Sequence, residues 1–143
     1  MNVSIGSDHA GFLLKEKVRK YLEGKGHTVK DFGCYSEERA DYPDFAHLVA
    51  RSVETREAER GILLCGSGNG INMSANKHAG IRAALCWKPE IAKLAREHND
   101  ANILSLPARF ISDEDAFTCA DLFLATAFEG GRHAERVLKI NKF

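Results

Sequence analysis

Residues 60–76 decide the fold and read R-G-I-L-L-C-G-S-G-N-G-I-N-M-S-A-N. The apolar run Ile62–Leu64 is typical of a strand that is buried on both faces of a parallel sheet. Cys65 follows this run, then comes a loop in which glycines alternate, and then a segment from Ile71 to Lys77 that can form a helix. A strand, a glycine loop and a helix in this order direct backbone N–H groups toward an anion. The stretch therefore predicts a ligand site at the carboxyl end of a strand.

The glycine loop fits no nucleotide-binding fingerprint. Ile71 stands where the last glycine of G-x-G-x-x-G would be, and the Gly-Lys-Ser/Thr of a Walker A loop is missing. The loop is interpreted either as an anion or oxyanion site or as a tight turn that needs its glycines for clearance. Cys65 also has two interpretations. It is either a small buried hydrophobic residue or a thiol whose pKa is lowered by the helix N-terminus that follows it.

The composition indicates an ordinary globular protein. With 143 residues, of which 44% are apolar and 28% charged, the chain suffices for one domain with one core. Lys and Arg together number 20, as do Asp and Glu, so the net charge of zero favours neither nucleic acid nor a membrane surface as a partner. No apolar run approaches the ~18 residues of a membrane span, and the first residues lack a signal-peptide pattern. We expect a cytoplasmic protein whose four widely spaced cysteines are free thiols, without a zinc motif.

Apolar patterning predicts five strands that alternate with helices. The strands are expected at residues 2–6, 27–32, 62–64, 80–86 and 102–106, and the helices at residues 11–23, 42–57, 71–77, 89–97, 113–128 and 132–142. This alternation is typical of stacked βαβ units around a parallel sheet. The prediction is a single α/β domain over residues 1–143 with a three-layer, doubly wound arrangement.

Four polar clusters lie beside loops: Asp8-His9, Cys65 to Gly70, His98-Asn99, and Arg132-His133 with Arg136. The first two should converge, because the carboxyl ends of parallel strands meet at one sheet edge. This argument does not place the other two. Structural alternatives are a helix cap for Asp8, a favourable helix-dipole position for His98 and a solvated helix face for the two arginines.

Taken together, the clusters offer a thiol base, a nest of N–H groups, imidazoles and an arginine pair. This set suits proton abstraction next to a carbonyl group on a phosphorylated substrate. The sequence shows neither a site for a hydride-carrying cofactor nor a metal-binding pattern among its histidines.

Several motifs resemble one family in the same order along nearly the whole chain. They are Asp8-His9-Ala10-Gly11-Phe12, Asp41-Tyr42-Pro43, Cys65-Gly66-Ser67-Gly68-Asn69-Gly70, Ala75-Asn76-Lys77, Gly80-Ile81-Arg82, His98-Asn99-Asp100-Ala101-Asn102, and Gly130-Gly131-Arg132-His133 with Arg136. The chain resembles the ribose-5-phosphate isomerase B family, within a wider group that includes the galactose-6-phosphate isomerase subunits.

The resemblance implies a Rossmann-like three-layer α/β/α sandwich with a five-stranded parallel sheet. It implies an aldose–ketose isomerase of the pentose phosphate pathway, free of metal and cofactor, which interconverts D-ribose 5-phosphate and D-ribulose 5-phosphate through a cis-enediolate. It also implies a homodimer, or a tetramer, with active sites at the subunit interface. The alternatives are an isomerase of a hexose 6-phosphate (allose or galactose) with the same mechanism and a non-catalytic sugar-phosphate sensor.

By the same resemblance, Cys65 would be the base that moves a proton between C2 and C1. The negative oxygen of the enediolate would be held by backbone N–H groups of Gly66, Ser67, Gly68, Asn69 and Gly70, with the Ser67 hydroxyl close by.

Other roles implied by the resemblance concern ring opening and phosphate binding. His98, reaching in from the partner subunit, would assist opening of the furanose ring, and Asp8 would bind sugar hydroxyls or share in ring opening. The phosphate would be held by His9, Arg132 and Arg136, with Arg109 and Asn99 contributed by the other chain.

Two positions bear on how the family pattern transfers to this chain. Ile71 stands where one branch of the family carries a glutamate base, so the base is expected to be Cys65. Pro107 stands where glycine is more common in the family, and it is expected to reshape the loop that presents Arg109.

Overall fold

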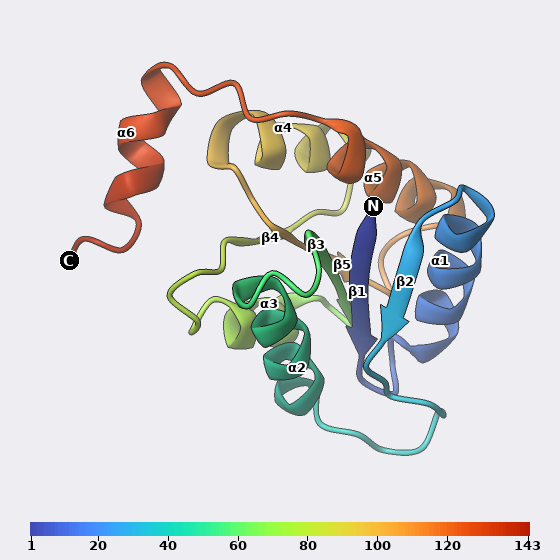
Figure 1. The fold of residues 1–143 in the computed structure, drawn as a ribbon. Helices are drawn as coiled ribbons and strands as arrows, with labels where there is room; N and C mark the ends of the chain where they lie inside the picture. Colours follow the sequence, from blue (N-terminus) through green and yellow to red (C-terminus); the bar gives the residue numbers. More distant parts are fainter.

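The computed structural model describes residues 1–143 as five strands that alternate with helices (Figure 1). The strands are β1 (Asn2–Ser7), β2 (Thr28–Asp31), β3 (Arg60–Cys65), β4 (Ala83–Leu85) and β5 (Ile103–Pro107). The helices are α1 (Phe12–Gly24), α2 (Tyr42–Glu54), α3 (Asn69–Ala75), α4 (Pro89–Asn99), α5 (Asp113–Ala125) and α6 (Arg132–Lys139). Every strand and helix expected from the sequence is present.

Several element boundaries differ from the sequence prediction by a few residues, and two of these differences have a clear local reason. The fourth strand begins at Ala83 rather than at residue 80, because the N–H groups of Gly80 and Arg82 bond to side chains of Glu54 and Asn102 instead of a neighbouring strand. Helix α4 extends through Asn99, two residues beyond the predicted end. It ends at Asp100, whose φ of 47° is left-handed.

All five strands are parallel, in the order β2-β1-β3-β5-β4, so β3 occupies the centre of the sheet. Their carboxyl ends lie together at one edge, as the strand arrows of Figure 1 show. The register pairs Ser7 with Leu64 and Cys65 with Pro107. Residues that follow β1, β3 and β5 are therefore neighbours at this edge.

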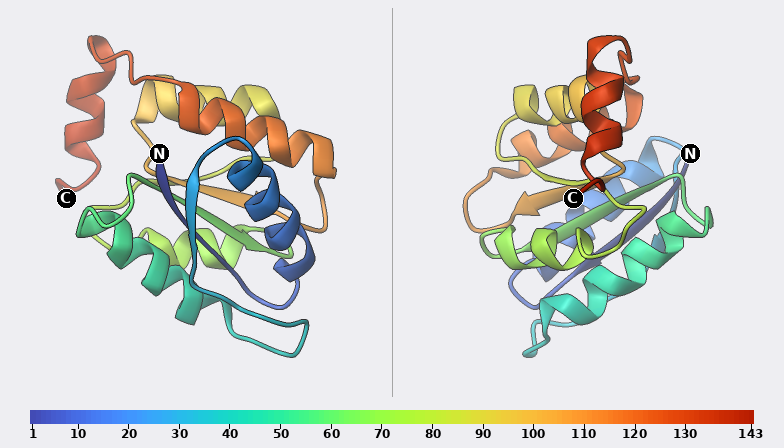
Figure 2. Two further views of the ribbon diagram at one scale, coloured as in Figure 1. Left: turned by 45° about the vertical axis from the view of Figure 1, so that its right-hand side comes forward. Right: turned by 90° about the vertical axis from the view of Figure 1, so that its left-hand side faces the viewer.

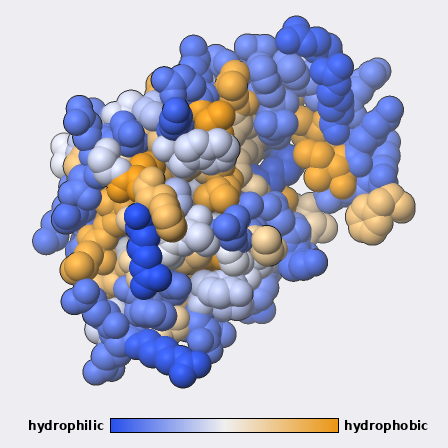
Figure 3. Space-filling view, turned by 180° about the vertical axis from the view of Figure 1, so that it is seen from behind, coloured by the Kyte–Doolittle hydropathy of each residue, from blue (hydrophilic) through white to orange (hydrophobic).

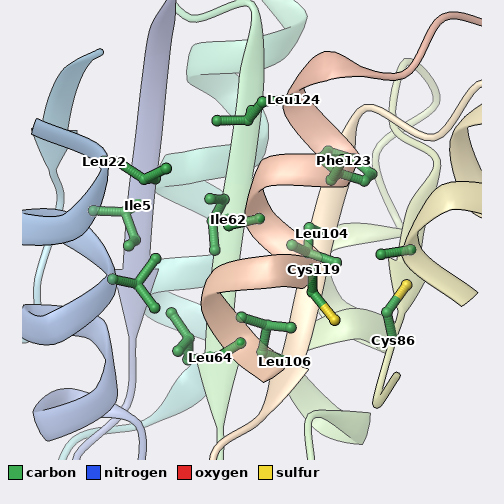
Figure 4. Packing of buried hydrophobic residues seen from close by; sticks show 14 of the residues in the cluster. Ile5, Leu22, Ile62, Leu64, Cys86, Leu104, Leu106, Cys119, Phe123 and Leu124 are labelled. Carbon is green, nitrogen blue, oxygen red and sulfur yellow. The ribbon is translucent and has the colours of Figure 1, made fainter. Parts of the chain in front are cut away.

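Helices cover both faces of the sheet (Figure 2). The larger core joins the sheet to α1, α4 and α5, and Figure 4 shows Ile62, Leu64 and Phe123 inside it. The smaller core joins the opposite face to α2 and α3, and it includes Leu63 and Cys65. Successive residues of β3 alternate between the two cores, which explains why the strand is apolar without interruption. The predicted three-layer α/β/α sandwich is confirmed.

The C-terminal helix α6 stands apart from the sheet, beside the last turn of α4 (Figures 1 and 2). Leu138, Ile140 and Phe143 are exposed on this helix and the tail beyond it. Figure 3 shows the region from behind, where hydrophobic residues gather at the right and a hollow separates them from the body of the molecule. No helix combines the length and the apolar character that crossing a bilayer requires.

Candidate active site

The carboxyl edge of the sheet brings Asp8 next to Cys65, as the shared edge of the parallel strands predicts. The N–H of Asp8 donates to the carbonyl of Leu64 over 3.3 Å, one residue before the cysteine. The Asp8 carboxylate is buried and accepts a hydrogen bond of 3.0 Å from the N–H of Gly11 at the start of α1. This bond lies within the turn before α1, whose N-cap is Gly11, so Asp8 is not the helix N-cap that the sequence left open, and the bond orients the carboxylate beside the thiol.

The Cys65 thiol is only 4% exposed and faces the core formed with α2 and α3. Its burial raises the pKa of the thiol above the ordinary value, and the negative charge of Asp8 raises it further. The backbone N–H groups of Ile71, Gly68 and Gly70 near the sulfur favour the thiolate and oppose this shift. The expected lowering of the pKa by the helix N-terminus is therefore wrong, because desolvation outweighs the N–H groups.

The contrast with two other buried cysteines shows what the glycine loop contributes. Burial raises the pKa of Cys86 and of Cys119 to about 12 each, with no backbone donor to oppose it. Both lie within the core of Figure 4. Cys65 alone among these three has backbone N–H groups near its sulfur, so only at Cys65 is the rise in pKa opposed.

The glycines of the loop are required by its shape. Gly68 has a φ of 78°, and a Cβ there would lie 2.4 Å from a side-chain carbon of Leu85. A Cβ on Gly70 would lie 2.5 Å from the ring of Tyr42. Close packing therefore explains these two glycines, and the same tight turn aims the N–H groups at Cys65. Here the two interpretations of the loop, tight turn and anion site, are compatible.

Ser67 and Asn69 are exposed at the mouth of the site. The Ser67 hydroxyl accepts hydrogen bonds of 3.3 Å from both the N–H and the side-chain amide of Asn69. This arrangement places a hydroxyl and an amide next to the buried thiol, where both can reach a polar ligand.

His9 follows Asp8 at the same edge and is half-buried. The N–H of Ala40 donates to its Nδ1 over 3.2 Å. Nδ1 also lies 3.1 Å from the carbonyl oxygen of Ala40, so the backbone of Ala40 holds this nitrogen in either tautomer and Nε2 is left for a ligand.

Arg109 lies against the glycine loop of its own chain. A Cβ built on Gly66 would be 3.2 Å from the Arg109 guanidinium, and the N–H of Arg109 donates to the carbonyl of Gly66 over 3.0 Å. Arg109 thus lies beside the glycine loop of its own chain, and its contribution to the site of a partner chain stays a prediction. Pro107 continues the β5 register opposite Cys65, and the N–H of Ala108 then bonds to the Cys65 carbonyl over 2.9 Å. The proline thus keeps the loop attached to β3 and holds Arg109 in place.

The remaining predicted residues form a second cluster elsewhere. His98 and Asn99 occupy the last turn of α4, and Arg132 and Arg136 lie on α6. The ring of His98 stacks on that of His133, with centroids 4.2 Å apart and planes at 15°. Neither arginine makes an ion pair or a side-chain hydrogen bond, so both guanidinium groups are available to an anion.

This second cluster lies at the opposite edge of the sheet. Helix α4 runs antiparallel to the strands, so its last turn lies near the start of β5, whereas Cys65 lies opposite the end of β5. The five residues of β5 separate the two edges by about 13 Å at 3.3 Å per step. The expectation that Arg132 and Arg136 join His9 within one chain is therefore wrong: they accompany His98 and Asn99.

Sequence reasoning missed two aromatic residues at the mouth of the first cluster. Trp87 and Phe110 are 49% and 74% exposed, and with Ser67 and Asn69 they line a hollow of about 330 Å³. Both lie in loops, where no periodic pattern singles them out, and the sequence does not show that their side chains are exposed. No sequence pattern indicates that Glu129 lies beside His98 and His133, as it does in the structure.

Comparison with known proteins gives a consistent result. The profile of the family described as Ribose/Galactose Isomerase matches residues 3–140. Ribose-5-phosphate isomerase B of Escherichia coli (strain K12) is 45% identical over 135 residues, which cover 94% of this chain and 91% of the relative. A Putative sugar phosphate isomerase of Rickettsia bellii is 43% identical, over 97% of this chain and 96% of the relative.

Solved structures agree. A crystal structure of a ribose 5-phosphate isomerase from Thermotoga maritima has a TM-score of 0.98 and 56% sequence identity, and the match covers 99% of this chain and 98% of that one. Ribose-5-phosphate isomerase B from Mycoplasma genitalium, solved with bound ribulose-5-phosphate, has a TM-score of 0.92 and 45% identity, over 97% of this chain and 93% of that one.

Proposed function

The chain belongs to the ribose/galactose isomerase family, and we propose that it interconverts D-ribose 5-phosphate and D-ribulose 5-phosphate. One observation carries the proposal: a buried thiol sits under three backbone N–H donors and beside a carboxylate, at the ligand edge of the sheet. The relative from Mycoplasma genitalium, which is 45% identical, was solved with ribulose-5-phosphate bound.

The chemistry follows from the environment of Cys65. As a thiolate, it removes the proton from C2 of the open-chain aldose while the C1 carbonyl oxygen takes up the negative charge. The proton of the C2 hydroxyl group passes to the oxygen on C1, the thiol returns its proton to C1, and the C2–O bond becomes the carbonyl of the ketose. A base whose pKa is raised binds the proton of a weakly acidic C–H more strongly, at the cost of a smaller ionised fraction at neutral pH. N–H groups of the glycine loop lie where they can stabilise charge on the sulfur or on the substrate oxygen.

We propose further that a complete site needs a second copy of the chain. His98 is the imidazole suited to opening the furanose ring, and Arg132 and Arg136 suit the phosphate, yet all three lie at the edge remote from Cys65. In a symmetric dimer, this cluster of one protomer would meet Cys65, Asp8 and His9 of its partner. The exposed Leu138 and Phe143 near α6 supply apolar surface that such a contact would bury.

We propose the cytoplasm as the location of the enzyme. All four cysteines are free thiols and all are buried. Free thiols are typical of proteins in a reducing compartment.

The test is isomerisation of D-ribose 5-phosphate in excess EDTA, beside allose 6-phosphate and galactose 6-phosphate. We expect rapid turnover of the pentose that EDTA does not change, a loss of about 10²–10⁴-fold in Cys65→Ala and near-normal activity in Cys86→Ala, a buried cysteine of the core. Preference for a hexose would keep the mechanism and replace the substrate. Failure of the wild type to turn over any of these sugars would overturn the proposal and favour a sugar-phosphate sensor.

A further inference from the structure

Three side chains with metal-ligating atoms meet between α4 and α6. They are His98 in the last turn of α4, Glu129 in the connection before α6, and His133 in the first turn of α6. One ligand atom of each lies within 4.8 Å of those of the other two. Nε2 of His133 lies 3.6 Å from Oε2 of Glu129.

An independent observation points to a ligand at this place. The His133 side chain is 8% exposed, and its Nε2 has no hydrogen-bond partner. A buried polar atom is nearly always paired, because leaving it unpaired costs the whole of its lost hydration. The unpaired nitrogen faces the carboxylate of Glu129 at a distance longer than a hydrogen bond, so room for a shared ligand remains between them.

The backbone holds the three residues together. The N–H of Glu129 donates to the carbonyl of Glu97 in α4 over 3.1 Å, which ties the connection to the helix that carries His98. The N–H of His133 donates to the carbonyl of Gly130 over 3.0 Å and closes the turn into α6. Side-chain rotation is therefore enough to bring the ligand atoms closer, and Glu129, 48% exposed, is free to rotate.

We propose that His98, Glu129 and His133 bind one Zn²⁺ ion, and that this ion inhibits the enzyme reversibly. Two imidazoles and a carboxylate are a set that holds zinc at about 2.0–2.2 Å and leaves the fourth position to water. Tetrahedral geometry at that radius places ligand atoms about 3.3 Å apart, so the stacked rings of His98 and His133 must turn out of their parallel arrangement for both nitrogens to face one ion. Zinc on His98 occupies the imidazole required for ring opening.

The flanking arginines determine when the metal binds. Arg132 and Arg136 repel a cation and attract a phosphate. Because zinc on His98 occupies the imidazole that the furanose ring needs, zinc and the sugar phosphate compete for this cluster, and inhibition is competitive with substrate. The inhibitory effect rests on the proposed function, whereas the binding of zinc does not.

Direct binding is measured first, without substrate. Metal-free protein is titrated with Zn²⁺ by calorimetry and with Co²⁺ by visible absorption, in the wild type, in Glu129→Gln and in Glu135→Gln. Glu135 is an exposed carboxylate on the same helix and is the matched control for charge. We expect one ion per chain with tetrahedral cobalt bands, affinity at least about 10-fold weaker in Glu129→Gln and unchanged affinity in Glu135→Gln.

Two other places on the chain compete for zinc and define the contrary result. One is the Cys65 thiol, and the other is the pair His47 and His78, whose ring nitrogens are hydrogen-bonded at 2.8 Å. Zinc affinity that is equal in the wild type and Glu129→Gln assigns the ion to one of these places and overturns the proposal. Absence of binding in the wild type overturns it as well.

Inhibition is measured second, as isomerase rate against Zn²⁺ at several substrate concentrations. We expect a raised KM with unchanged kcat, reversal by EDTA, and resistance of Glu129→Gln, which keeps its basal activity. Equal inhibition of Glu129→Gln and the wild type overturns the inhibitory role. Zinc binding with no turnover of any sugar phosphate would leave the metal site standing and refute the proposed function. Normal turnover without zinc binding would support the proposed function and refute the metal site.

Discussion

Mixing two inactive variants tests whether one active site is shared by two chains. Cys65→Ala removes the base at the carboxyl edge, and His98→Asn removes the imidazole at the opposite edge, about 13 Å away along β5. Each variant alone is expected to lose about 10²–10⁴-fold in rate, the usual contribution of a general acid–base group.

The heterodimer of these two variants should recover activity. If each site combines Cys65 of one chain with His98 of its partner, one of the two sites carries both substitutions and the other carries neither. We therefore expect about half of the wild-type activity per dimer. The assay is turnover of D-ribose 5-phosphate after co-expression with two different affinity tags and purification on both.

A mirror-image heterodimer provides the control. It pairs a wild-type chain with a chain that carries both Cys65→Ala and His98→Asn, so each shared site contains one substitution and the dimer should be inactive. If both groups act within one chain, the two results exchange: the first heterodimer stays inactive and the mirror image keeps about half. That exchange would refute the split site.

Two further predictions concern the glycine loop and its thiol. Gly68→Ala should lower the free energy of unfolding by about 1–3 kcal/mol, since its φ of 78° is strained for alanine and its Cβ would lie 2.4 Å from a side-chain carbon of β4. Urea denaturation measures this loss, and Gly24→Ala, where a Cβ meets nothing within 4 Å, is the control. Because the pKa of Cys65 is raised by burial and by Asp8, its reaction with iodoacetamide should rise with pH beyond the range of an ordinary thiol, and Asp8→Asn should move this rise to lower pH; an unmoved profile would contradict the assigned charge effect.

Much of the fold was predictable because local patterns dictate it. The uninterrupted apolar run of β3 identified a central strand, and the alternation of strands and helices then fixed the layers. The boundary errors arose from tertiary contacts. The residues before Ala83 have the apolar pattern of a strand. Their N–H groups, however, donate to the side chains of Glu54 and Asn102, which are distant in sequence, and are not available to a neighbouring strand. Pairing of this kind leaves no local signal.

The candidate site was predictable only in part. Parallel topology was enough to bring Asp8 to Cys65, because both follow adjacent strands. The direction of the Cys65 pKa shift was not predictable, since it depends on a balance between burial and nearby N–H groups that only the packed structure reveals. The contact of Arg109 with its own glycine loop was not predictable either, because a side chain's direction from a loop depends on its neighbours, here Gly66, and not on motif order.

The raised pKa of Cys65 makes physical sense if assembly completes the site. An isolated chain holds the base but lacks the imidazole and the arginine pair at the same edge. A thiolate freely available there would react with oxidants and electrophiles, since the thiolate is the reactive form. A thiol that is 4% exposed and mostly protonated is protected from these reactions. Under the proposed function, a partner's His98 would open the sugar and its arginines would hold the phosphate, so proton abstraction would be confined to the assembled enzyme.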